Sequence, residues 1–373
     1  MFLLDFFSGN KTKPVKKGKK KKRNEHYRVE LSHLNPLKEV KMYGHFKMGA
    51  GPKKTECQDS LCMMDRFADD CFFFAVYDGH GASGKEASHA ANDSIQNYYE
   101  KNIKKIKSIT SDYKKEEFIA YAFENAEEKL QASGIDYSNS GTCCISVFIQ
   151  RNKAWVANVG DSRCVMGRVT AKEKSAIDLS NDHKPTRPDE RARILKAGGK
   201  VERFAQDGVP VGPYRVWADE EGPGIAMTRS MGDLMSKKIG LISLPEIEVI
   251  ELTPSDKFIV IGSDGLWDVM GSTEVVGFVL QHEHKESVAE ALVLEARSRW
   301  EEMGKMNRRS GDAGIGDVPF MKFGCDDITA VVAYLTFYTE DELEEIAKHI
   351  IPVEIKEEKD EKKDKKGKKK KKY

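Results

Sequence analysis

Residues 72–81 read FFFAVYDGHG, an apolar run long enough for one buried strand that stops at Asp-Gly-His-Gly. A single Asp-Gly pair is explained equally well by a tight hairpin turn. The pattern recurs, however, because residues 257–263 lead into Asp264 and residues 154–159 lead to Asp161. Sites are commonly built at strand ends on a rigid scaffold, and carboxylates that converge there repel one another unless a cation is present. The three strands therefore predict an acidic site that holds metal.

The composition indicates a globular protein. The chain has 373 residues, of which 39% are hydrophobic and 32% charged, enough for one large domain or two. No apolar run approaches the roughly 20 residues of a transmembrane helix. The first seven residues are too short for the core of a signal peptide, and Phe2 stands where N-myristoylation requires glycine. We therefore expect an intracellular protein, in the cytoplasm, the nucleus or both.

The seven cysteines are scattered and odd in number, and no pair has C-x-x-C spacing. This pattern indicates reduced thiols in or near the core, and it excludes the usual zinc spacings.

The formal net charge of +1 conceals two basic ends. Residues 11–23 carry nine positive charges and no acid, and residues 356–373 carry eleven lysines and five acids, so the chain between them is acidic. Lysine-rich segments without periodicity favour disorder or loose attachment. The predicted organisation is a basic arm over 1–36, a globular domain over 37–338, a helix over 339–351 and a lysine-rich tail over 352–373.

Several helices are predicted from capping signals and apolar stripes. Capping-box spacing at Ser83 opens a helix expected to run to about Ile106. A second helix follows from one apolar stripe, formed by Ile119, Ala122, Phe123, Ala126 and Leu130. Others are expected from Thr186, from about Thr273, from Ser287 and from Thr339. The apolar face of the last one, made by Leu343, Ile346, Ala347 and Ile350, is expected to pack on the domain rather than to bind a partner.

The remaining segments read as strands and loops. Residues 141–169 are predicted to form three short strands in a meander, and residues 328–335 a last strand. Residues 205–224 are expected to form a surface flap or loop, and residues 303–321 a long loop. Because strands and helices do not alternate regularly, this order favours an α+β layered fold with largely antiparallel sheets.

The candidate metal ligands are all oxygen donors. Magnesium and manganese prefer such ligands, whereas zinc or copper would call for cysteine or several histidines. Two such ions would lower the pKa of a water that bridges them and create a nucleophile for attack on phosphorus. The chain has no G-x-S-x-G elbow, P-loop or kinase motif set. The candidates are Asp59, Asp78, Asp161, Asp264, Asp268, Asp326 and Asp327, with the carbonyl of Gly79.

Five short motifs follow one another along the chain: YDGHG at 77–81, GDSR at 160–163, DHKP at 182–185, TRSMGD at 228–233 and SDGLWD at 263–268. In this order they resemble the motif set of the metal-dependent protein phosphatases, the type 2C family. The resemblance covers about residues 43–334, and PYRVW at residues 213–217 is most similar to plant and protist members.

The resemblance implies a fold and a set of roles. The fold would be a sandwich of two antiparallel sheets flanked by helices, layered α-β-β-α, with two magnesium or manganese ions at one edge. Asp78 would bridge both ions and His80 would be the general acid for the leaving alkoxide. The other implied metal ligands are the carbonyl of Gly79, Asp264 and Asp326, then Asp59 through water, and Asp161 with Asp268 at a weaker third site.

Three positions depart from the family pattern. Lys54 stands where the family often has an arginine that binds the substrate phosphate, and it supplies charge without a bidentate fork. Gln58 replaces a glutamate. The pair Asp326-Asp327 replaces Asp-Asn; the register makes Asp326 the ligand, with Asp327 as the alternative.

The sequence thus predicts a phosphatase that acts on phosphoserine and phosphothreonine in proteins, through a hydroxide bridging two ions and without a phosphoenzyme. The alternative is a catalytically silent protein of the same fold that serves as a scaffold through its basic arms. The arms are read first as solvated tails or nuclear import signals, and second as contacts for nucleic acid or an acidic membrane surface.

Overall fold

The computed structural model describes residues 31, 34–51, 54–206, 209–218, 224–282, 285–310 and 324–349. Its large compact unit is Pro36–Phe337. Most of both basic ends lies outside the described residues. The described part of the C-terminal region forms helix α8 (Glu340–His349), and Ile350 of its predicted apolar face lies outside the described residues. No helix among the described residues has the length and apolar character needed to cross a membrane.

Two antiparallel sheets form the centre of the compact unit. The first contains, in spatial order, β1 (Leu37–Lys47), β13 (Ile328–Phe337), β12 (Asp256–Gly262), β6 (Arg163–Val169) and β7 (Lys174–Asp178). The second contains β11 (Glu246–Glu251), β5 (Lys153–Val159), β4 (Gly141–Gln150), β3 (Cys71–His80) and β2 (Ser60–Ala68), with the short β10 (Met231–Gly232) on β4.

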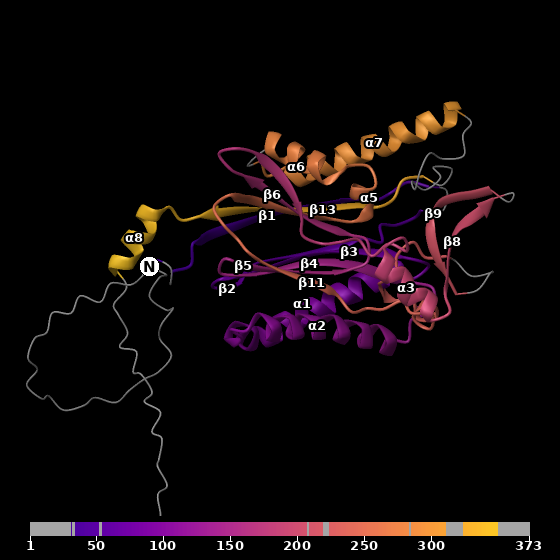
Figure 1. Ribbon diagram of the computed structural model, residues 1–373, viewed down its shortest axis with the longest axis horizontal. Helices are drawn as coiled ribbons and strands as arrows, with labels where there is room; N and C mark the ends of the chain where they lie inside the picture. Colours follow the sequence, from indigo (N-terminus) through magenta and orange to yellow (C-terminus); the bar gives the residue numbers. More distant parts are fainter. Residues whose placement is uncertain are drawn as a thin grey trace, which may run out of the picture. The chain divides into compact units, whose positions relative to one another are not determined.

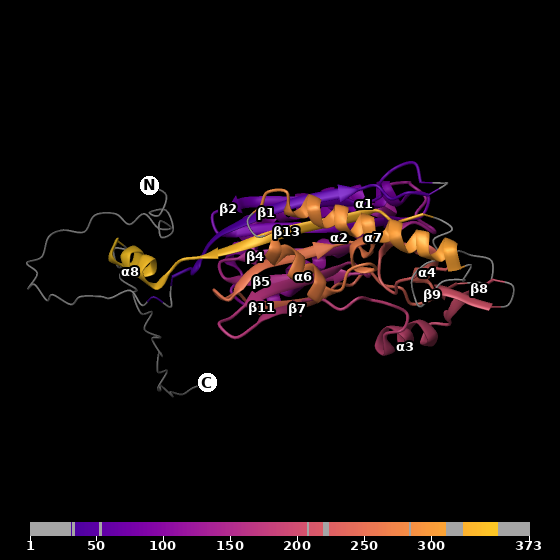
Figure 2. The same cartoon turned by 90° about the horizontal axis from the view of Figure 1, so that it is seen from above.

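Helices cover the outer face of each sheet, as Figure 1 shows. On the second sheet lie α1 (Gly84–Ser108) and α2 (Asp112–Ala132). The five residues of the apolar stripe predicted for α2 are all buried. On the first sheet lie α6 (Ser272–Gln281) and α7 (Val288–Ser310), and α7 runs along β1 and β13 (Figure 2). The layered α-β-β-α sandwich predicted from the sequence is confirmed.

The continuous apolar run of β3 is explained by burial on both faces. Phe73 and Tyr77 pack under α1 and α2, while Phe72 and Phe74 point between the two sheets. Strand side chains alternate between faces, so a strand in the middle of four layers needs apolar residues at every position. Each such side chain contributes about 1.5–3 kcal/mol when it is fully buried. This double burial fixes the position of the end of β3, where Asp78 stands.

The predicted meander over residues 141–169 is wrong at its second turn. β4 pairs with β5, but β6 pairs with β12 and β7 in the other sheet. The chain changes sheets at Gly160, whose φ of +111° favours glycine and where a Cβ would come 2.2 Å from Sγ of Cys143. Periodicity identifies strands but not their partners, so this crossing was not visible in the sequence.

The described residues of the segment expected as a surface flap or loop lie mostly in a two-stranded hairpin, β8 (Lys200–Gln206) and β9 (Val209–Trp217), called the flap below. Two other expectations need correction. Helix α7 continues to Ser310, through the start of the loop expected at 303–321, whose remainder falls mostly outside the described residues. Ser83 precedes α1 but makes no side-chain cap. The shorter helices are α3 (Pro188–Lys196), α4 (Leu234–Lys237) and α5 (Asp264–Trp267).

The seven cysteines are all free, and five of them are buried, which confirms their interpretation as thiols in or near the core.

Candidate active site

A cavity of about 480 Å³ opens where the ends of β3 and β12 meet the segments that precede β13 and follow the flap. Six of the residues predicted for the site line it: Asp78, Gly79, His80, Asp264, Asp268 and Asp326. The structure therefore brings together residues that are up to 248 positions apart in the sequence. Asp59, Asp161, Asp327 and Lys54 are not among the lining residues.

The end of β3 is packed so closely that Gly79 accepts no side chain. A Cβ at this position would lie 2.2 Å from the carbonyl oxygen of Gly84 and 2.4 Å from that of Gln58. In β3, Asp78 is opposite Cys143 and His80 is opposite Gly141, so the strand remains paired up to its last residue. The backbone that presents the carboxylate and the imidazole is thereby held on both sides.

The lining carboxylates sit in an environment that disfavours their charge. Burial raises the pKa of Asp78 and Asp264 well above the ordinary value, and repulsion from neighbouring aspartates adds to it. Burial likewise raises the pKa of Asp268 to about 6. Burial also raises the pKa of Asp326, against the opposing charge of Lys54. The basic side chains of the protein therefore do not offset the burial and mutual repulsion of these aspartates.

Asp59 lies behind the cavity and joins three distant segments. Its Oδ2 accepts hydrogen bonds from Oγ of Ser263 at 2.9 Å and from Oγ1 of Thr329 at 2.6 Å, the latter across 270 positions. Its Oδ1 is buried without a partner among the described residues. Burial raises the pKa of Asp59 to about 7, partly against those two hydrogen bonds. A buried carboxylate oxygen without a hydrogen bond needs a partner, and a cation or a water molecule would supply one.

The adjacent residues Asp326 and Asp327 have opposite surroundings. The side chain of Asp326 is 53% exposed and lines the cavity, whereas that of Asp327 is 2% exposed. Asp327 accepts hydrogen bonds from the amides of Gly49 and Gln58 at 2.7 and 2.8 Å. Nζ of Lys54 lies 2.6 Å from Oδ2 of Asp327 and 3.6 Å from Oδ1 of Asp326. The geometry therefore favours Asp326 as the residue that faces a ligand, and it places Lys54 beside Asp327.

Asp161 is already paired with a lysine. Nζ of Lys184 lies 2.5 Å from its Oδ2, and Sγ of Cys143 lies 3.3 Å from its Oδ1. Burial alone would raise the pKa of Asp161, but the charge and the hydrogen bond of Lys184 hold it below the ordinary value. Attraction to Asp161 and Asp264 in turn outweighs burial and raises the pKa of Lys184. The predicted weaker third metal site thus contains a built-in ammonium group.

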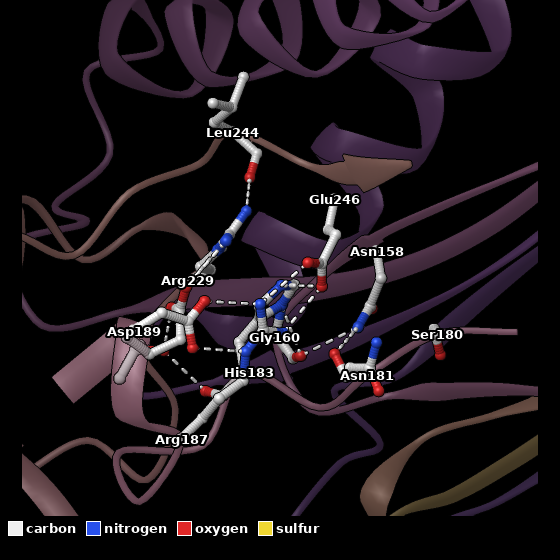
Figure 3. A network of polar contacts seen from close by, with 12 residues as sticks. Asn158, Gly160, Ser180, Asn181, His183, Arg187, Asp189, Arg229, Leu244 and Glu246 are labelled. Carbon is white, nitrogen blue, oxygen red and sulfur yellow. Dashed lines mark hydrogen bonds and ion pairs between the residues drawn. The ribbon is translucent and has the colours of Figure 1, made fainter. Parts of the chain in front are cut away.

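A polar network joins Gly160 and His183, the sequence neighbours of Asp161 and Lys184 (Figure 3). The amide of Gly160 donates to Nδ1 of His183 at 3.1 Å, and the amide of His183 donates to the carbonyl of Gly160 at 2.9 Å. The amide of Thr228 donates to the carbonyl of His183 at 2.8 Å, and its hydroxyl donates to Oε2 of Glu190. Burial and the charge of Arg229 lower the pKa of His183 to about 4, so the ring is neutral and accepts at Nδ1. Its position fixes Lys184 next to it.

His80 is held by an aspartate that the sequence analysis did not assign. Nε2 of His80 lies 2.7 Å from Oδ2 of Asp233, which also accepts from Oγ of Ser230 at 2.5 Å. Burial would lower the pKa of His80, but Asp233 raises it above the ordinary value. Asp233 itself has φ +49° and ψ +50°, a conformation that aspartate tolerates better than most side chains.

Three residues of the site were missed although each lies in a quoted motif: Lys184 in DHKP, Asp233 in TRSMGD and Arg215 in PYRVW. All three line the cavity. The motif strings were the available signal, but a string does not reveal which carboxylate a basic residue meets.

The donor set fits a hard divalent cation. The oxygen of a carboxylate or carbonyl is the preferred ligand of magnesium and manganese, and the repulsion among the lining aspartates is what such an ion offsets. Among the described residues, no three histidine, cysteine, aspartate or glutamate side chains are close enough to hold an ion by themselves. The carbonyl of Gly79 and water would have to complete the coordination of any ion bound here.

Comparison with known proteins places the chain in a family. The family model described as "Protein phosphatase 2C" matches residues 50–303. "Probable protein phosphatase 2C 35" of Arabidopsis thaliana is 32% identical over 263 residues, which cover 66% of this chain and 74% of that protein. "Probable protein phosphatase 2C 65" of the same plant is 32% identical over 266 residues, which cover 66% of this chain and 69% of that protein.

Solved structures share the fold at lower identity. A serine-threonine phosphatase 2C from Toxoplasma gondii superposes with a TM-score of 0.62 at 21% identity, over 81% of this chain and 97% of its own. A sex determining protein of C. elegans gives a TM-score of 0.59 at 20% identity, over 84% of this chain and 68% of its own.

Proposed function

Since the chain belongs to the protein phosphatase 2C family and is a metal-dependent protein serine/threonine phosphatase, we propose that two magnesium or manganese ions bind in the 480 Å³ cavity. The residues proposed to hold them are Asp78, the carbonyl of Gly79, Asp264 and Asp326. When bound, the ions would offset the charge of the phosphate and lower the pKa of water, so that a nucleophile is available without a phosphoenzyme.

The cluster of lining carboxylates is the observation that carries this proposal. Asp78 and Asp264 are buried enough for their pKa to be raised well above the ordinary value, and neighbouring aspartates repel their charged forms. Apolar packing would stabilise the fold better than such a cluster, so its presence is explained by a ligand of opposite charge. Asp59 supports the cluster through Ser263 and Thr329, which tie the end of β12 to the start of β13.

His80 is proposed as the general acid that protonates the departing serine or threonine hydroxyl. It lines the same cavity, and Asp233 keeps it in place and favours its protonated form. Asp161 and Asp268 are proposed as the ligands of a weaker third ion, which would compete with Lys184 for Asp161.

The proposal is tested with Asp264→Asn in the full chain. Hydrolysis of a phosphothreonine peptide with manganese should fall by at least about a thousandfold, because one carboxylate ligand is replaced by a neutral amide. Thermal unfolding in chelator should be unchanged or shifted upward, since the substitution removes one of several repelling buried charges. Asp65→Asn, the same chemical change at an exposed position of β2, is the matched control.

Chelation separates the enzyme from a silent scaffold. Activity of the unmodified chain should disappear with EDTA and return with manganese. Full activity of the purified Asp264→Asn variant, or activity indifferent to chelator, would contradict the proposed metal site.

A further inference from the structure

Among the described residues, the lysine and arginine side chains that line the acidic cavity are Lys184 and Arg215, and Lys54 contacts two aspartates beside it. Lys54 does not line the cavity and lies 2.6 Å from Asp327. Lys184 lines it but lies 2.5 Å from Asp161. Arg215 also lines it, from strand β9 of the flap. A phosphate entering the cavity would therefore find the two lysines engaged by carboxylates.

Arg215 is the basic residue whose hydrogen-bonding capacity remains available. Over the described part of the chain, its guanidinium makes one hydrogen bond, from Nη1 to the carbonyl of Gly224 at 2.7 Å, and no ion pair. A guanidinium has five N–H donors, so four are left. Burial lowers the pKa of Arg215, against attraction to Asp161 and Asp264. The group therefore sits in a partly dehydrated position within the electrostatic reach of the site's carboxylates.

The backbone next to Arg215 is anchored. Val216 is fully buried, and it exchanges two backbone hydrogen bonds with Ile225, at 2.8 and 3.0 Å. Both residues pack in a small apolar cluster with Val201 of β8 and Ile194 of α3. Gly224, whose carbonyl accepts from Arg215, directly precedes Ile225 of this bridge. The guanidinium is thus carried by the fixed part of the flap and is oriented before substrate arrives.

We propose that Arg215 binds the phosphate group of the substrate, the role that the sequence pattern assigned to Lys54; this inference rests on the proposed function. Two of its free N–H groups form a fork that matches two phosphate oxygens, which an ammonium cannot do. The ligand class is a phosphate monoester dianion on serine or threonine. The flap then contributes directly to binding of the reacting group, and its position relative to the carboxylates sets how tightly phosphate is held.

The test measures phosphate binding itself. Orthophosphate is titrated calorimetrically into the manganese-loaded full chain, with Arg215→Ala, Arg215→Lys and Lys200→Ala as variants. Lys200 is exposed on β8 of the same hairpin and does not line the cavity, so it controls for loss of one positive charge. Arg215→Ala should weaken orthophosphate binding by about tenfold to a hundredfold. The orthophosphate affinity of Arg215→Lys should lie between those of Arg215→Ala and the unmodified chain, and that of Lys200→Ala should stay within about twofold of the unmodified chain.

Two further measurements distinguish contact from support. Guanidinium chloride at low millimolar concentration should restore part of the orthophosphate affinity of Arg215→Ala, and should not raise that of the unmodified chain. Manganese affinity and thermal unfolding should be the same in all four proteins.

The assignment would be overturned by an unchanged orthophosphate affinity in Arg215→Ala, by an equal loss in Lys200→Ala, or by a loss of manganese affinity that accounts for the effect. If the unmodified chain bound orthophosphate but hydrolysed no phosphopeptide, the proposed function would fail while the titration still decided the role of Arg215. Absence of orthophosphate binding to the unmodified chain would also overturn it.

Discussion

The end of β3 and the flap face the same cavity, but they are built differently. β3 is paired on both sides, by β2 and β4, and its side chains are buried on both faces. The flap strands β8 and β9 pair with each other in a separate two-stranded sheet. Their Phe204 and Val209 side chains are 52% and 58% exposed.

This difference separates two requirements of the site. Carboxylates that repel one another need a scaffold whose packing energy exceeds the repulsion, and the four-layer core supplies it. A basic side chain that binds the substrate, as proposed for Arg215, needs only local anchoring of its backbone. The Val216–Ile225 bridge provides that anchoring. The flap can therefore vary in sequence with little effect on the fold, whereas the end of β3 cannot.

The largest effect is expected at Gly79. Gly79→Ala would force a Cβ to within 2.2 Å of a backbone oxygen, so the end of β3 or the start of α1 must move. We expect a loss of at least about 3 kcal/mol in the free energy of unfolding, measured by urea titration. Gly277→Ala in α6 is the control, since a Cβ there meets nothing within 4 Å, and it should be neutral or stabilising. Equal stability of the two variants would show that the end of β3 is not rigid.

A smaller effect is expected from pH and metal together. Burial raises the pKa of Asp59 to about 7 and that of Asp268 to about 6, so both carboxyls hold protons in the folded chain that the unfolded chain releases above about pH 4. The contribution of these two carboxyls to stability without metal should thus be full below that pH and be lost as the pH rises toward 7. A bound cation reverses the trend because it requires the ionised carboxylates.

The measurement is the midpoint of thermal unfolding with manganese and with EDTA, from pH 5.5 to pH 8. The stabilisation by manganese should grow by several degrees across this range. His183, whose lowered pKa has the opposite pH dependence, contributes equally to both curves and cancels in the difference. A manganese effect that is constant or shrinks with rising pH would argue against carboxylate ligands.

The smallest effect is expected on the flap surface. Phe204→Ala should change the free energy of unfolding by less than about 0.5 kcal/mol, because Phe204 is already 52% exposed to solvent. Urea titration beside the unmodified chain is sufficient. A loss above about 1 kcal/mol would show that the flap is part of the core, and the contrast with β3 would then fail.

Much of the architecture followed from local patterns. The stripe of α2 and the two-sided burial of β3 could be predicted because periodicity reports how many faces of an element are covered. The pairing of β6 could not, because the apolar residues in the middle of the strand carry no mark of the sheet that they join. The loop expected from Met303 was wrong at its start, because α7 continues to Ser310. The sequence of α7 contains no proline that would have ended the helix earlier.

By itself, the sequence determined the kind of chemistry: oxygen donors at strand ends, no nucleophile motif and a motif order typical of one family. Only the tertiary structure decided which neighbour of each charged group is closest. It turns Asp326 to the cavity and Asp327 to Lys54, pairs Lys184 with Asp161, and leaves Arg215 with free donors. The reason is physical, since ion pairs and hydrogen bonds depend on distance in space, and here they join residues as far as 270 positions apart. The strand end at Asp78 is local, but the site around it exists only when the whole domain has folded.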